Sequence, residues 1–386
     1  MTARENAVSW VTGIGLTPFG RHEGKSSLDL MTMAATAALD DAGLARRDVD
    51  GLVCGYATTM PHIMLSTLFA EHFGVQPRYA HAAQVGGATG FALIMLAHLI
   101  VAGGAADHVL VVAGENRLTG QTRDMTMQTL AQAGHARYEV PLGPTVPAYY
   151  GLVASRYMHE FGNSERDLAE LAVLMRRHAS SHSGAQLREP ITVEQVLAST
   201  PIAPPLKLMD CCPISDGAAA FLISREPVSP HALRIAGSSQ AHTHQHVTAA
   251  QDLAHYGAKA SMTRAMAQAG IGLGDVGYAA IYDSFTITLA ILLEEIGLSA
   301  RGQSGRDAAS GRYAADGELP LNTHGGLLSY GHCGVAGALA HLAEAHLQMT
   351  RRAGVRQIAR EPAVAMLHGD GGIMSSHISL ILERTR

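Results

Sequence analysis

Three side chains in the second half of the sequence could carry acid–base chemistry: Tyr282, Tyr330 and His332. A phenol can transfer a proton, although its usual pKa of about 10 must be lowered before it acts as a base at neutral pH. A helix predicted to begin beside residues 332–337 offers a dipole that could lower it. His332, ahead of that helix, can direct an N–H toward an oxygen that gains negative charge. These residues predict proton transfer combined with oxyanion stabilisation.

Each candidate also has a structural interpretation. Tyr282 ends an apolar run, and a buried strand tyrosine is often structural. Tyr330 could simply pack within its glycine-rich loop, and His332 could cap a helix. His368 could be a core histidine whose ring nitrogens are satisfied internally.

The composition indicates a large α/β enzyme. The 386 residues are 47% apolar and poor in aromatics, with abundant glycine, and the net charge is −5. Without a long basic run, we expect no nucleic-acid partner. The longest apolar stretch, 91–102, is too short to span a bilayer. The four cysteines, which form no CxxC pair or metal pattern, are Cys54, Cys211, Cys212 and Cys333. We therefore expect a cytoplasmic enzyme without a metal in this chain.

An internal repeat is the strongest indication of the fold. Residues 38–57 align without a gap on residues 265–284, and each copy reads as a helix ended by glycine, a turn and an apolar strand. Segments 85–103 and 332–349 each open a helix with glycines. Each of these helices is followed by an apolar strand, and the strands are 108–115 and 363–370. The pattern predicts two related α/β halves with parallel strands and crossover helices.

The polar segment 118–196 interrupts this pattern and predicts an inserted, partly helical cap. We expect residues 1–117 together with 197–229 to form the N-terminal half, and residues 230–386 to form the C-terminal half.

Four segments together resemble the sterol-carrier-protein type of thiolase. They are residues 11–44, 190–220, 282–298 and 321–337, and the resemblance extends over nearly the whole chain. It implies a thiolase fold of two βαβ-rich halves packed in five layers (αβαβα). It also implies a coenzyme A thioester as substrate, with no covalently bound cofactor, and a homodimer paired along the edges of the N-terminal halves.

The departures from that family concern its nucleophile. Thiolases place a reactive cysteine at the N-terminus of the helix that starts near residue 87, where the helix dipole activates a thiol. The matching position here is Gly86, and the second thiolase cysteine is replaced by His368. Acyl transfer through a covalent thioester at Gly86 is therefore excluded.

The altered set resembles a subgroup labelled lipid-transfer proteins, whose studied members are retro-aldolases acting on steroid acyl-CoA side chains. This resemblance implies that Tyr282 and Tyr330 are the acid and base, with Tyr330 on the substrate hydroxyl in our preferred assignment. It implies a catalytic role for His332 and His368. Substrate or oxyanion contacts are expected at Gly86, Asn322 and Gly369. A small partner protein with an OB fold and a zinc ribbon is implied as well.

Two alternatives stay open. The same oxyanion site could catalyse carbon–carbon bond formation of the aldol or Claisen type. The chain could also be a non-catalytic scaffold that binds lipid or acyl-CoA. The joint retention of Tyr282, Tyr330, His332 and Asn322 argues against a decayed site.

Overall fold

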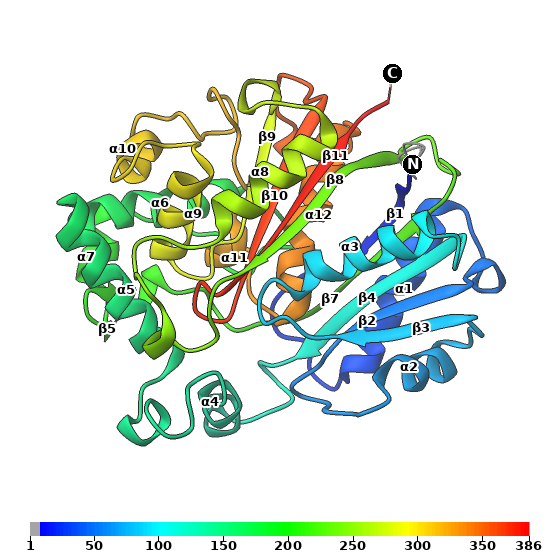
Figure 1. The fold of residues 1–386 in the computed structure, drawn as a ribbon, viewed down its shortest axis with the longest axis horizontal. Helices are drawn as coiled ribbons and strands as arrows, with labels where there is room; N and C mark the ends of the chain where they lie inside the picture. The colour runs from blue at the N-terminus through cyan, green and yellow to red at the C-terminus, as the bar shows by residue number, and fades with distance from the viewer. Residues whose placement is uncertain (1–7, 386) are drawn as a thin grey trace.

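The computed structural model describes residues 8–385, and its frame is a mixed sheet of nine strands. The strands are β1 (Trp10–Leu16), β2 (Gly51–Gly55), β3 (Tyr79–Ala83), β4 (His108–Asn116), β7 (Asp216–Ser224), β8 (Leu233–His242), β9 (Tyr278–Ile281), β10 (Val364–Gly371) and β11 (Ser376–Glu383). They are ordered β3-β2-β4-β7-β1-β8-β11-β10-β9, so β1 and β8 join two half-sheets at the centre (Figure 1).

The two half-sheets repeat one topology. In the first, β1 pairs with β7, β7 with β4, β4 with β2 and β2 with β3. In the second, β8, β11, β10 and β9 follow the same sequence of antiparallel and parallel pairings, and Leu321 bridges to β9 where a fifth strand would lie. The repeat predicted from the sequence is confirmed.

Helices complete the five layers. The central layer holds α3 (Thr89–Ala102) and α12 (Val335–Met349), which pack against each other and contact strands of both half-sheets. One outer layer holds α1 (Ser27–Ala42) and α2 (Leu65–Phe73), and the other holds α8 (Ala258–Ala269) and α9 (Thr286–Ile296). Since α3 lies between two sheets, it is apolar around most of its circumference, as a fully buried helix must be.

Glycines allow the outer helices to lie close to their strands. A Cβ atom at Gly15 would come within 2.0 Å of the Ala34 carbonyl oxygen in α1. At the equivalent place in the second half, a Cβ atom at Gly237 would come within 2.1 Å of the Ala265 carbonyl oxygen in α8. The repeat therefore extends to the packing of helix on sheet.

The segment predicted as a cap is helical. It contains α4 (Arg123–Ala131), α5 (Val146–Phe161), α6 (Glu165–Ser180) and α7 (Val193–Ala198), followed by the hairpin of β5 (Pro201–Ala203) and β6 (Leu206–Lys207). Helices α5 and α6 pack against α9, and α6 also contacts α10 (Ser304–Ala309) and α11 (Gly326–Ser329) (Figure 1). The cap thus covers the C-terminal half, and its limits as a separate unit stay a prediction.

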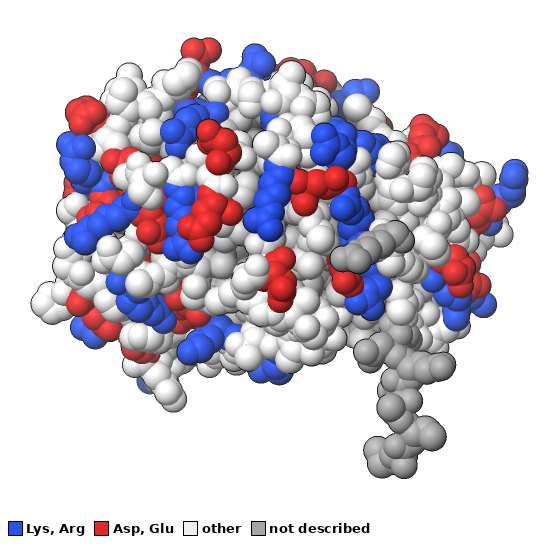
Figure 2. Space-filling view, turned by 90° about the horizontal axis from the view of Figure 1, so that it is seen from above, with Lys and Arg blue, Asp and Glu red and all other residues white. Residues whose placement is uncertain are grey.

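Charged side chains of both signs are interspersed on the face seen in Figure 2, without a broad patch of one sign. Among the described residues, no helix combines the length and the apolar character needed to cross a membrane.

Candidate active site

The structure brings two of the predicted residues together at the N-terminal end of α3. The Tyr282 hydroxyl lies 2.9 Å from Nε2 of His332. Tyr282 directly follows β9, and its N–H donates to the His368 carbonyl oxygen on β10. His332 is held by its own backbone, because its N–H is bonded to the Pro213 carbonyl oxygen. Tyr282 is 3% exposed, and His332 is the more accessible of the two.

The hydrogen bonds assign the tautomer of His332. The N–H of Gly334 donates to Nδ1 of His332 at 3.1 Å, so Nδ1 carries no proton. Burial and the nearby positive charge of Arg117 lower the pKa of His332 to about 3, which keeps the ring neutral at physiological pH. Its one ring proton therefore sits on Nε2 and is donated to the Tyr282 oxygen.

Because His332 donates in its hydrogen bond to Tyr282, the hydroxyl proton of Tyr282 is not used in that bond. Since the phenol oxygen accepts from His332, the Tyr282 O–H must donate elsewhere, and within residues 8–385 it has no acceptor. Burial, followed by the neighbouring groups Cys212 and Asp370, raises the pKa of Tyr282 well above 10. The expected lowering of a tyrosine pKa by the helix dipole is therefore not found for Tyr282, whose hydroxyl stays protonated at neutral pH.

Gly87 leaves the space that the phenol of Tyr282 fills, and Gly86 allows another backbone segment to approach closely. A Cβ atom at Gly87 would lie 2.3 Å from the Tyr282 hydroxyl, whereas one at Gly86 would point at the backbone of Gly372, 2.6 Å from its nitrogen. Gly86 also has a φ of +57°. A nucleophile that pointed into this site would therefore have to occupy position 87, not the position 86 that we matched from the sequence.

Tyr330 does not join this pair. It is 1% exposed, and its ring packs on Phe19, His182 and His324, with centroid distances of 4.7, 4.8 and 5.4 Å. Its hydroxyl has one weak contact, 3.5 Å from the Thr17 carbonyl oxygen. Burial raises the pKa of Tyr330 above its usual value. The hydroxyl has no contact with Tyr282 or His332.

The His368 side chain lies on the face of β10 that points away from α3. Successive side chains of a strand point to opposite faces. Gly369 faces α3, because a Cβ atom there would be 2.4 Å from the ring of Phe91. His368 therefore points away from α3, where its ring is bonded to Ser379 at 2.8 Å and to His377 at 3.2 Å. Gly369 permits close packing, and the buried His368 ring has both nitrogens engaged by neighbouring side chains.

Asn322 uses its amide to position the site. Its Oδ1 accepts from the Ile281 N–H at 2.9 Å, and its Nδ2 donates to the Ile281 carbonyl oxygen at 2.7 Å. The side chain thus replaces a neighbouring strand at the end of β9 and fixes the residue before Tyr282. The structure thus shows a positioning role for Asn322, and the expected substrate contact stays a prediction.

Asp370 is a carboxyl group that the sequence did not single out; it shares the strand face of His368, nearer the end of β10, and its charge contributes to the raised pKa of Tyr282. It is 1% exposed, its Oδ2 accepts from the Tyr150 hydroxyl at 2.9 Å, and its Oδ1 is enclosed with no partner in the described chain. Burial raises the pKa of Asp370 well above 3.8. Tyr150 in turn stacks on Phe285, with ring centroids 4.3 Å apart.

Arg117 is a second group that we missed. It follows β4 directly, is 8% exposed, and has no ion pair with any described residue. Asp216 holds the loop after it, accepting at Oδ1 from the N–H groups of Leu118 and Thr119 at 2.7 and 3.1 Å. The Arg117 charge lowers the pKa of His332 and opposes the rise in the pKa of Tyr282, so Arg117 lies close enough to influence both side chains.

None of the four thiols is activated. Burial raises the pKa of Cys211 to about 12 and raises the pKa values of Cys54, Cys212 and Cys333 further. Cys333 lies near the N-terminus of α12, but the loss of hydration outweighs the helix dipole there.

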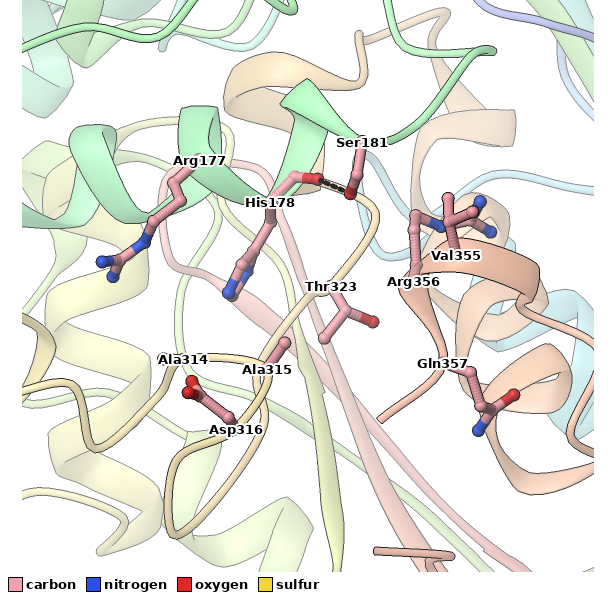
Figure 3. Close-up of a pocket in the computed structure, with 10 residues that line it drawn as sticks. All are labelled: Arg177, His178, Ser181, Ala314, Ala315, Asp316, Thr323, Val355, Arg356 and Gln357. Carbon is pink, nitrogen blue, oxygen red and sulfur yellow. Dashed lines mark hydrogen bonds between the residues drawn. The ribbon is translucent and has the colours of Figure 1, made fainter. Parts of the chain in front are cut away.

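A separate cavity of about 390 Å³ opens beside α6, with Arg177, His178 and Arg356 in its wall (Figure 3). Tyr282 and His332 do not line it. Arg356 is engaged with Glu344 at 2.9 Å, which reduces the free positive charge of the cavity. Across residues 8–385, no three His, Cys, Asp or Glu side chains are grouped as metal ligands would be.

Comparisons with known proteins agree with the fold. Residues 9–227 match the family model "Thiolase, N-terminal domain", and residues 239–384 match "Thiolase C-terminal domain-like". The chain is 31% identical to an acetyl-CoA acetyltransferase of Methanothermobacter thermautotrophicus, over 95% of this chain and 98% of that protein. It is 33% identical to a steroid side-chain-cleaving aldolase of Thermomonospora curvata, over 85% of this chain and 88% of that protein.

A solved structure of the Ltp2-ChsH2(DUF35) aldolase superimposes with a TM-score of 0.85 at 29% identity, covering 98% of each chain. The relatives thus include both acyltransferases and carbon–carbon lyases on one fold. The family models together match residues of both halves and leave only short stretches outside. The chain belongs to the thiolase family.

Proposed function

We propose that this chain is an acyl-CoA retro-aldolase that cleaves a β-hydroxyacyl-CoA into a ketone and a shorter acyl-CoA. The observation that carries the proposal is the Tyr282–His332 hydrogen bond, which puts a phenol at the N-terminal end of α3 beside a glycine. The similarity to the steroid side-chain-cleaving aldolase supports the reaction class, and a bulky, steroid-like acyl group is the substrate that we favour.

The reaction needs a base, an acid and a site for negative charge. The base removes the proton of the β-hydroxyl, the bond between the α and β carbons breaks, and its electron pair passes to the thioester as an enolate. The acid then protonates the α carbon. Tyr282 is the acid in this proposal, because its proton is free and a thioester enolate is far more basic than a phenolate. His332 stabilises the phenolate that remains, by donating from Nε2.

We assign the base to Asp370 in preference to Tyr330. Asp370 has an unpaired carboxylate oxygen, and burial raises its pKa above the usual range, which makes the ionised carboxylate a stronger base. Tyr330 has a raised pKa, which makes its hydroxyl a poor base, and its contacts are with other aromatic rings.

A cysteine-dependent thiolase reaction is not supported. Position 87 is glycine, and the raised pKa values of all four thiols leave no thiolate to attack a thioester. The similarity to acetyl-CoA acetyltransferases is accounted for by the shared fold, since function depends on the site.

Two assemblies belong to the proposal. The name of the Ltp2-ChsH2(DUF35) aldolase structure joins two proteins, which supports a partner protein for this chain, and a small partner of the OB-fold and zinc-ribbon type is the one that we propose. Strand β3 is the outer strand of the nine, and His81 and Ala82 on it are exposed. An unpaired edge of this kind supports a homodimer formed along β3.

The test is to offer a panel of β-hydroxyacyl-CoA thioesters, with and without the partner, and to identify the products by mass. We expect a ketone and an acyl-CoA in equal amounts. Asp370→Asn should abolish cleavage, whereas Tyr330→Phe should retain most of it. If Asp370→Asn cleaves normally, the base is assigned wrongly. If acyl-CoA binds but no member of the panel turns over, the scaffold interpretation replaces this proposal.

A further inference from the structure

The enolate oxygen in the proposed reaction needs a hydrogen-bond donor or a positive charge, and His332 cannot supply it. Both ring nitrogens of His332 are engaged, Nδ1 by the Gly334 N–H and Nε2 by Tyr282. From the sequence we expected His332 to direct its N–H at the thioester oxygen. Because that N–H is given to Tyr282, the negative charge on the thioester oxygen needs another positive group.

Arg117 is a largely buried cation that forms no direct ion pair with any residue from 8 to 385. The side chain is 8% exposed, its Nε is enclosed without a hydrogen-bond partner, and the described residues offer no carboxylate within ion-pair distance. Leaving a cation unpaired in a protein interior costs several kcal/mol unless a bound anion compensates it. A ligand that carries or develops negative charge would supply the missing partner.

The local backbone aims this cation at the site. The Asp216 carboxylate clamps the loop after β4, and a Cβ atom at Gly334 would lie 3.5 Å from Cδ of Arg117. Gly334, with a φ of +70°, is two residues from His332 and bonds to its ring. The Arg117 stem therefore passes directly over the turn that holds His332.

Glu115 interacts with the Arg117 charge, which opposes the rise that burial causes in the Glu115 pKa, but the two side chains form no direct ion pair. Its Oε2 is occupied by the Thr58 N–H at 2.6 Å, the Thr58 hydroxyl and the Thr59 N–H. Its Oε1 is enclosed and unpaired, and it makes no ion pair with Arg117 within 4.0 Å. The Glu115 carboxyl thus braces the strand end of β4 without removing the charge beside His332.

We propose that the Arg117 guanidinium binds the thioester oxygen and stabilises the enolate as the carbon–carbon bond breaks. This inference rests on the proposed function and adds a catalytic residue to it. A preorganised donor at a developing oxyanion is worth about 100- to 1,000-fold in rate.

The experiment isolates enolate formation from bond cleavage. Propionyl-CoA is incubated in D₂O with the enzyme and its partner, and deuterium uptake at the α carbon is followed by mass, in parallel with kcat and KM for cleavage. Arg117→Met should slow both exchange and kcat by about 100-fold or more, with KM changed less than threefold. Arg117→Lys and added guanidinium with Arg117→Ala should each restore part of the rate.

Arg176→Met is the matched control. Arg176 is also 8% exposed, but its Nε donates to Ser329 at 3.0 Å and its guanidinium also donates to the Glu189 carbonyl oxygen. This variant should lose stability and keep the exchange rate per folded molecule. The inference is overturned if Arg117→Met keeps the wild-type kcat and exchange, or if its loss lies in KM alone. A wild-type enzyme that cleaves no hydroxyacyl-CoA contradicts the proposed function instead.

Discussion

Replacing Tyr282 by phenylalanine tests the acid most sharply, because a matched tyrosine, Tyr278, lies on β9, the strand that directly precedes Tyr282. The substitution removes the proposed proton donor and leaves the Nε2–H of His332 without its acceptor. General acid catalysis commonly contributes about 100- to 10,000-fold, or about 3 to 5 kcal/mol of barrier at about 1.4 kcal/mol per tenfold. The unpaired N–H should also cost about 1 to 3 kcal/mol of stability.

Tyr278→Phe is the control. Tyr278 is fully buried on β9, and its hydroxyl bonds to the Thr323 hydroxyl at 3.0 Å and accepts from the Thr323 N–H at 3.1 Å. Removal of the Tyr278 hydroxyl also leaves a buried N–H, that of Thr323, without an acceptor. The two variants should therefore lose similar amounts of unfolding free energy. Both variants are compared by urea unfolding and by cleavage kcat. The reasoning fails if Tyr282→Phe stays within threefold of wild type, or if Tyr278→Phe loses as much activity.

Three further predictions concern the surroundings of the site and the assembly. Gly87→Ala should reduce kcat at least 100-fold in the cleavage assay, because its Cβ atom would displace the Tyr282 hydroxyl, 2.3 Å away; retained activity would contradict this geometry. Stability should fall as the pH drops from about 6.5 to about 4, because burial lowers the pKa of His346 to about 4 and only the unfolded chain takes up the proton in this window. His346→Leu should flatten the slope of unfolding free energy by about 1.4 kcal/mol per pH unit in chemical denaturation, and an unchanged slope would count against it. Ala82→Lys, at an exposed position of β3, should convert the proposed homodimer to a monomer in light scattering, and an unaffected dimer would place the interface elsewhere.

The fold was predictable because its signal is repeated along the chain. Paired helices ending in Gly43 and Gly270, both with φ near +70°, and the apolar strands after them fix two equivalent units. Hydrophobic burial of both faces of each half-sheet then leaves the layered arrangement as the way to cover them. The pairing of β1 with β8 that joins the halves has no comparable sequence signal, because it spans only two residue pairs.

The site was predictable only in part, because the sequence does not fix which face of a strand a side chain takes or where a loop side chain points. Tyr282 and His332 follow recognisable elements, and the structure pairs them. His368 could not be separated from its neighbour, since a shift of one residue in a strand reverses the face of the side chain. The direction of Tyr330 depends on the packing of its ring against Phe19 and His182, which are distant in sequence.

The groups that we missed share a position that sequence reasoning could have used. Arg117 lies just beyond β4 and Asp370 near the end of β10, and Tyr282 directly follows β9. These are carboxyl ends of strands in α/β half-sheets, where ligands commonly bind. Polar residues that directly follow a buried apolar strand were the available signal. The sequence could not show that Nε of Arg117 and Oδ1 of Asp370 lack hydrogen-bond partners, and this structural observation is what identified the two residues.

The central claim is that this thiolase fold breaks a carbon–carbon bond with Tyr282 as proton donor and without an acyl-enzyme. The most direct measurement is a single-turnover reaction with a β-hydroxyacyl-CoA in D₂O, quenched and analysed by mass for both the products and the intact protein. The account predicts a ketone, an acyl-CoA with one deuterium at the α carbon, and a protein of unchanged mass. A protein carrying the mass of an acyl group, or cleavage that requires free CoA, would contradict it.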